Sequence, residues 1–173
     1  MPRVWLPLIL LLLATPMRAA DGAGVIAATI ENAQIRGAAT FRWLGLPLYT
    51  ARLFTPGGAA VDWSRPVALQ LTYARDIKRQ SLVDATVSEL ERLEGSQADH
   101  AVIGQKLSPC FRNVSEGDQF VAATRGRDEV VLFFNGNKTC RASHDNLGRR
   151  FLDIWLSDNS RSPSQSRKLR GGT

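Results

Sequence analysis

The residue that most directly suggests binding chemistry is Arg42, in the stretch from Gly37 to Phe54. Phe41 and Trp43 flank it in the sequence, so its guanidinium lies among large apolar groups. An arginine in apolar surroundings suits a carboxylate, because its planar fork of donors matches the two oxygens. Two interpretations of Arg42 follow: an anion anchor inside an apolar cleft, or an arginine on a solvated strand face.

This stretch has the pattern of a β-hairpin. Aromatic and aliphatic residues alternate with polar ones on both arms, which is typical of half-buried strands. A three-residue loop from Leu44 to Leu46 pairs Arg42 with Leu48 and places Thr50 on the same face. A two-residue loop instead puts Arg42 beside Tyr49, and the sequence leaves both registers open.

The common catalytic and cofactor motifs are missing from this chain. His100 and His144 lie far apart, with no acidic or cysteine partner at ligand spacing, so the usual zinc patterns do not apply. The sequence has no G-x-S-x-G motif and no glycine-rich phosphate loop before a helix. We therefore expect no metal, no cofactor and no catalytic residue.

The N-terminus has the pattern of a secretory signal peptide over residues 1–20. Arg3 supplies the short positive region, Val4 to Ala14 form an apolar run, and two small alanines end the segment. The apolar run of about 11 residues is shorter than the about 20 residues that a membrane span needs. We expect an exported protein, periplasmic or secreted, in which residues 21–173 form a single domain without a membrane span.

Export gives a specific meaning to the two cysteines, Cys110 and Cys140. An even pair in an oxidising compartment is typical of a disulfide, and two small buried thiols are the alternative. Closing a loop of about 30 residues stabilises the fold by roughly 3–4 kcal/mol in the chain-entropy model. We therefore expect a disulfide between Cys110 and Cys140.

The composition and the hydrophobic periodicity indicate one folded α+β domain. The chain has 173 residues, 44% hydrophobic and 22% charged, and its net charge of +6 forms no stripe suited to nucleic acid. Besides the hairpin, we expect strands over 21–36, 66–73, 119–124 and 129–134, and helices beginning near 81, 98, 145 and 163. This order favours a largely antiparallel sheet.

Several segments together resemble the chalcone isomerase-like family. They are FRWLGLPLYTARLF from Phe41 to Phe54, Phe134-Asn135-Gly136, FLDIWLS from Phe151 to Ser157, Ser162-Pro163 and Leu169-Arg170-Gly171, in this order. Gly117-Asp118 also falls where that family has a short turn into a strand. The resemblance implies an open-faced β-sandwich, in which a layer of helices covers one side of an antiparallel sheet and a cleft lies between them.

The resemblance also implies roles for two residues. Plant members are intramolecular lyases that close a chalcone, and non-enzymatic members bind fatty acids through an arginine in the cleft. Arg42 resembles that arginine, and Thr50 resembles the cleft threonine. The tyrosine and asparagine of the plant enzymes have no counterpart, since the region from Asp76 to Val87 contains neither. The family fold would also bring Cys110 close to the strand that carries Cys140.

These observations predict an exported, non-catalytic protein that binds an apolar ligand with an acidic head. A fatty-acid-like molecule, anchored by Arg42 with help from Thr50, fits this description best. One alternative is an intramolecular lyase of the chalcone–flavanone isomerase type. The other is an envelope interaction or structural protein whose cleft is filled by its own side chains. We expect no nucleic-acid partner, and the sequence does not identify any protein partner.

Overall fold

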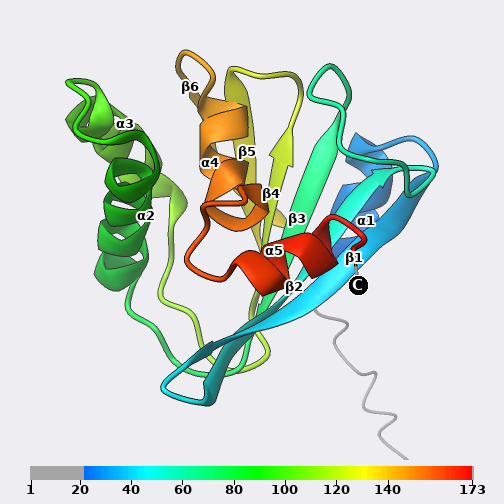
Figure 1. Cartoon of the computed structure of the whole chain (residues 1–173), viewed down its shortest axis with the longest axis horizontal. Helices are drawn as coiled ribbons and strands as arrows, with labels where there is room; N and C mark the ends of the chain where they lie inside the picture. The colour runs from blue at the N-terminus through cyan, green and yellow to red at the C-terminus, as the bar shows by residue number, and fades with distance from the viewer. Residues whose placement is uncertain (1–21, 173) are drawn as a thin grey trace, which may run out of the picture.

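The structure, a computed structural model, describes residues 22–172, which form one six-stranded antiparallel sheet with helices packed on it (Figure 1). The strands follow one another across the sheet in chain order: β1 (Ala33–Trp43), β2 (Leu46–Pro56), β3 (Val67–Tyr73), β4 (Gln119–Thr124), β5 (Glu129–Phe134) and β6 (Asn137–Ser143). The helices are α1 (Gly22–Thr29), α2 (Arg79–Glu94), α3 (His100–Leu107), α4 (Leu147–Leu156) and α5 (Pro163–Leu169). The predicted α+β class with an antiparallel sheet is confirmed.

The alternation of β3 shows how the sheet acquires two different faces. Leu69 and Leu71 point to one face and belong to the main hydrophobic core, which α2 to α5 cover. Ala68 points to the other face, where it packs in a smaller cluster with Ile26 of α1. Figure 1 shows α4 and α5 in front of the sheet, α2 and α3 at the left of the view, and α1 behind the sheet. The predicted helical layer is present, and α1 adds a partial cover on the second face.

The first element differs from the sequence-based expectation. A strand over 21–36 was expected, but the segment Gly22–Thr29 is helical, and β1 begins only at Ala33. Ile26 and Ile30, four residues apart, are both buried, and this spacing places them on one face of a helical turn. A short apolar segment can fit both the two-residue period of a strand and the 3.6-residue period of a helix. Packing against the second face of the sheet therefore decided in favour of the helix.

The hairpin between β1 and β2 has the two-residue loop of one expected register and the Thr40–Thr50 pair of the other. Its loop is the two residues Leu44-Gly45, both with positive φ, at 48° and 81°, as tight two-residue hairpin turns require. A bulge after the Phe41–Tyr49 pair then shifts the pairing of the two strands by one position. Arg42 consequently lies opposite Pro47, and neither Leu48 nor Tyr49 is its partner.

The C-terminal helix closes the helical layer over β1. Helix α5 approaches β1 so closely that a Cβ atom at Gly37 would lie 2.1 Å from the carbonyl oxygen of Lys168. Only glycine permits this approach, because any side chain would collide with the backbone of α5.

Within residues 22–172, no helix is long and apolar enough to cross a membrane. The signal peptide predicted over residues 1–20 lies outside the described part of the chain.

Candidate functional site

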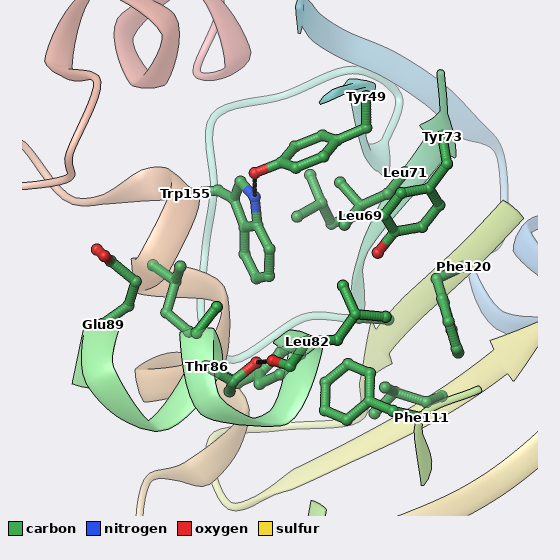
Figure 2. Close-up of a pocket in the computed structure, with 15 residues that line it drawn as sticks. Tyr49, Leu69, Leu71, Tyr73, Leu82, Thr86, Glu89, Phe111, Phe120 and Trp155 are labelled. Atoms are coloured by element: carbon green, nitrogen blue, oxygen red, sulfur yellow. Dashed lines mark hydrogen bonds between the residues drawn. The ribbon is translucent and has the colours of Figure 1, made fainter. Parts of the chain in front are cut away.

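An apolar pocket lies between the helix-covered face of the sheet and helices α2 and α4 (Figure 2). Its volume is about 120 Å³. Side chains from β2 to β5 form one wall, and side chains from α2 and α4 form the other. We call it the aromatic pocket, after the six aromatic residues that surround it: Tyr49, Tyr73, Phe111, Phe120, Phe151 and Trp155.

The periodicity of the surrounding elements places these side chains. On β3, Leu71 and Tyr73 lie on one face because alternate residues of a strand point the same way. On α2, Leu82, Thr86 and Glu89 are spaced by four and three residues, which puts all three on the helix face toward the sheet. Thr86 donates its hydroxyl to the carbonyl oxygen of Leu82 at 2.8 Å, so this polar group is satisfied within the helix.

Two tyrosines bring hydroxyl groups into the aromatic pocket. Trp155 donates its indole N–H to the hydroxyl oxygen of Tyr49 at 3.0 Å. Tyr73 is only 4% exposed, and Figure 2 shows its hydroxyl pointing into the pocket, where no described residue forms a hydrogen bond with it. Burial raises the pKa of Tyr49 to about 12 and also raises the pKa of Tyr73. Both phenols are therefore uncharged O–H donors at ordinary pH.

Charge is confined to the rim of the pocket. Glu89 is the only charged residue among those that line it. The Glu89 carboxylate accepts hydrogen bonds from Nε of Arg92 at 2.9 Å and from Nε of Arg161 at 2.6 Å. These two cations are bound to Glu89 and do not line the pocket. A carboxylate placed inside would therefore lose its hydration without gaining a counter-charge.

The two residues predicted to bind the ligand lie outside this pocket. Arg42 is exposed at the hairpin tip and donates to the carbonyl oxygen of Gly45 at 3.1 Å. Thr50 is half-buried, and its hydroxyl lies 3.2 Å from that of its strand partner Thr40. Neighbouring residues of a strand point to opposite faces, so Tyr49 faces the helices while Thr50 faces away from them. The fold thus brings Tyr49, and neither Arg42 nor Thr50, to the aromatic pocket.

Tyr73 is not among the site residues expected from the sequence; it is the last residue of the strand expected over 66–73. The signal for its position was its alternation with Leu69 and Leu71, which correctly places it on the buried face of β3. A tyrosine at such a position brings a polar atom into an apolar interior. Whether that atom finds a partner depends on α2 and α4, which the local sequence of β3 does not specify.

The disulfide expected from export is present in the structure. Cys110 and Cys140 are bonded, with their Cα atoms 5.0 Å apart. Cys110 ends a short 3-10 turn after α3, and Cys140 lies on the edge strand β6. The bond therefore fastens the helical layer to one edge of the sheet, beside the part of the chain that supplies Phe111 to the pocket.

Both histidines belong to an ion cluster centred on Arg150 of α4. Arg150 donates to Glu94 through Nε at 2.8 Å and to Asp99 through a terminal nitrogen at 2.7 Å. His100 contacts Glu94 at 2.8 Å, and His144 contacts Asp99 at 2.9 Å. The cluster therefore joins the end of α2, the start of α3, the end of β6 and α4. Across residues 22–172, no three His, Cys, Asp or Glu side chains are arranged to hold a metal ion.

The charges of this cluster reinforce one another. Hydrogen bonds from Arg150 lower the pKa of Asp99, and His144 adds to the effect. Burial on its own would raise the pKa of Glu94, but hydrogen bonds from Arg150 and His100 outweigh it and lower that pKa. The hydrogen bonds to both carboxylates in turn raise the pKa of Arg150. The arrangement is a structural clamp of paired charges.

No protein-family model matches the chain, and no curated protein matches its sequence. Among solved structures, its fold is similar to that of a fatty-acid binding protein from Arabidopsis thaliana, with a TM-score of 0.60 and 11% sequence identity. The similarity covers 82% of this chain and 89% of the plant protein. The open antiparallel sheet with helices thus matches the chalcone isomerase-like fold that the sequence motifs predicted.

Proposed function

We propose that this chain is an exported protein that binds an apolar small molecule with an acidic head, similar to a fatty acid. The apolar part of the ligand enters the aromatic pocket. The observation that carries the proposal is the cavity between sheet and helices, which is lined almost entirely by apolar side chains. Small-molecule sites are typically concave and apolar, with a few polar groups that fix orientation. Similarity in fold to a plant protein named for fatty-acid binding supports the same function.

The volume of the pocket limits which part of the ligand enters. At about 120 Å³, it is smaller than the roughly 300–1,000 Å³ of most ligand sites. It is close to the engineered cavity of about 150 Å³ that takes benzene. A single ring or the end of a chain therefore fits the pocket as it stands. A longer chain requires the α2 wall, with Leu82 and Thr86, to move away from the sheet.

For the acidic head we propose Arg42 at the exposed hairpin tip, with Thr50 as a second contact; because Thr50 faces away from the helices, this head lies outside the aromatic pocket, at the edge of the sheet. Arg42 is exposed, and to bind a carboxylate at the surface of the hairpin it exchanges its contact with the carbonyl oxygen of Gly45 for that anion. A carboxylate held there stays hydrated, so the pair contributes only the about 0.2–1 kcal/mol of an exposed ion pair. Most of the affinity then comes from apolar burial in the aromatic pocket.

A calorimetric titration of delipidated protein with fatty acids of increasing chain length tests this proposal. We expect wild type to bind, and Ala85→Phe, which adds a ring at the α2 wall, to bind more weakly. Arg42→Ala should weaken binding of the acid by up to about fivefold and leave binding of its methyl ester unchanged. Arg52→Ala, which removes another exposed arginine of the same hairpin, is the matched control.

Each outcome of the titration has a distinct meaning. Failure of wild type to bind any chain length would contradict the proposal and favour an envelope interaction or structural protein. Unchanged binding of the acid by Arg42→Ala would remove Arg42 from the site while leaving the pocket in place.

Export is the second part of the proposal. It is motivated by the signal-peptide pattern over residues 1–20, and the Cys110–Cys140 disulfide supports it, because such bonds persist in oxidising compartments. N-terminal sequencing of the protein from its native compartment should give a start near residue 21. A chain that keeps Met1 and has two reactive thiols would overturn this part.

A further inference from the structure

We infer that the aromatic pocket binds its ligand through an uncharged oxygen, such as a ketone, ester or ether oxygen, that accepts a hydrogen bond from Tyr73. This inference rests on the proposed function and names the chemical group that enters the pocket. It goes beyond the acidic head, which is proposed to remain outside at the hairpin.

The hydroxyl of Tyr73 is the one hydroxyl of the pocket that has no hydrogen-bond partner among the described residues. Tyr73 is 4% exposed, its hydroxyl points into the cavity, and none of the described residues forms a hydrogen bond with it (Figure 2). The other two hydroxyls that line the pocket have partners: Thr86 donates to the carbonyl of Leu82 at 2.8 Å, and the oxygen of Tyr49 accepts from the indole N–H of Trp155 at 3.0 Å, which leaves the Tyr49 O–H as a second donor. The hydroxyl faces the cavity, so either water or a ligand oxygen can accept its hydrogen bond, and a ligand that displaces water from the cavity must supply that acceptor to avoid leaving the donor unpaired.

The surroundings of the hydroxyl determine that this oxygen is uncharged. Leucine and aromatic side chains line the cavity, and no arginine, lysine or histidine is among them. Burial inside would remove the water that a carboxylate needs, and no cation lines the cavity to replace it. Burial also raises the pKa of Tyr73, so the phenol remains a donor and never becomes a competing anion.

The volume of about 120 Å³ selects probes of one aromatic ring with a short substituent. Acetophenone and ethylbenzene have nearly the same size, but only acetophenone carries a ketone oxygen. Benzoate has the same ring with an anionic head. These three compounds therefore separate the contribution of the uncharged oxygen from those of apolar burial and of charge.

NMR titration of the disulfide-bonded protein with each probe tests the inference. Wild type should bind acetophenone about threefold to tenfold more tightly than ethylbenzene, which is the effect of one net hydrogen bond. In Tyr73→Phe this preference should disappear while ethylbenzene still binds. Thr72→Val is the control, because it removes a hydroxyl from the neighbouring position of β3, on the opposite face of the sheet, and should keep the preference. Benzoate should bind more weakly than acetophenone at neutral pH and gain affinity as acid converts it to the uncharged form.

Tyr73→Phe removes no hydrogen bond of the described structure, so we expect it to fold with an unchanged or higher melting temperature. Circular dichroism checks this before the titrations. Equal affinity of wild type for acetophenone and ethylbenzene, a preference that survives in Tyr73→Phe, or no binding of either probe would overturn the inference. Binding of fatty acids without any preference for the ketone would overturn it while leaving the proposed function intact.

Discussion

Replacing Arg150 with methionine tests whether the ion cluster holds the helical layer in place. Methionine keeps the apolar stem of the side chain but removes the guanidinium, which donates four hydrogen bonds to Glu94 and Asp99. The two carboxylates then lose the cation that lies between them. Glu94 ends α2 and Asp99 precedes α3, whereas Arg150 belongs to α4. Removing the guanidinium therefore also weakens the attachment of α2 and α3 to α4.

The burial of the three side chains sets the expected magnitude. Arg150 is 16% exposed, Glu94 22% and Asp99 33%. The cluster therefore lies between an exposed pair, worth about 0–1 kcal/mol, and a buried pair, whose disruption costs about 3–5 kcal/mol. We expect Arg150→Met to lower the free energy of unfolding by about 2–3 kcal/mol. For a domain of this size, that corresponds to a melting temperature lower by roughly 4–12 °C.

The pH dependence gives this prediction a second readout. In the folded protein, hydrogen bonds from Arg150 lower the pKa of Asp99, and for Glu94 they outweigh burial and lower its pKa too. A carboxylate with a lowered pKa stabilises the fold at pH values above its ordinary pKa, near 4, and this stabilisation is lost as the pH falls through the lowered value. Stability of wild type should therefore fall steeply below about pH 5, whereas the slope for Arg150→Met should be shallower.

Urea unfolding of both proteins between pH 7 and pH 3 measures both effects. Arg149→Met is the matched control, since Arg149 is 47% exposed and donates to a single carboxylate, Asp153, at 3.3 Å. We expect the control to change stability by less than about 1 kcal/mol. Two results would refute the role of the ion cluster as a clamp: equal losses of unfolding free energy in the two variants, or parallel plots of unfolding free energy against pH for wild type and Arg150→Met.

Two further predictions concern the frame around the pocket. Reducing the Cys110–Cys140 bond, which spans 30 residues, should lower the free energy of unfolding by about 3–4 kcal/mol, and melting curves with and without reductant measure this. Gly37→Ala should destabilise by more than about 1 kcal/mol, because its Cβ would lie 2.1 Å from the carbonyl oxygen of Lys168. Gly24→Ala on α1, whose Cβ would meet nothing within 4 Å, should be neutral or stabilising. Equal melting temperatures for the two glycine variants would contradict this assignment.

Strand positions that depend on local pattern could be predicted well from the sequence. The strands expected over 119–124 and 129–134 coincide with β4 and β5, because turn residues end them on both sides. Asn135-Gly136 forms the tight turn into β6, with positive φ at both residues. In these segments the turn chemistry and the period of two agree, so neighbouring residues alone determine the structure.

The site could not be predicted in the same way, because residues distant in the sequence assemble it. The hairpin was recognised, but the bulge after Phe41 moved Arg42 opposite Pro47 and left it exposed. The pocket wall opposite Tyr73 comes from α2 and α4, which follow β3 in the chain at very different distances. Periodicity assigns a residue to a face, and only the packing of the other elements determines whether that face is filled or hollow.

The pocket and the hairpin divide the proposed ligand between two environments. Tyr73 offers an uncharged donor in an apolar interior, whereas Arg42 offers a positive charge at the exposed hairpin tip. An anion loses little hydration at Arg42 and would lose most of it beside Tyr73, so the charged end belongs outside. A simple fatty acid satisfies Arg42 alone. A molecule with an acidic end and an oxygen-bearing apolar end binds both Arg42 and Tyr73. Any preference of the protein for such a molecule over a simple fatty acid must then come from the hydrogen bond to Tyr73 in the pocket.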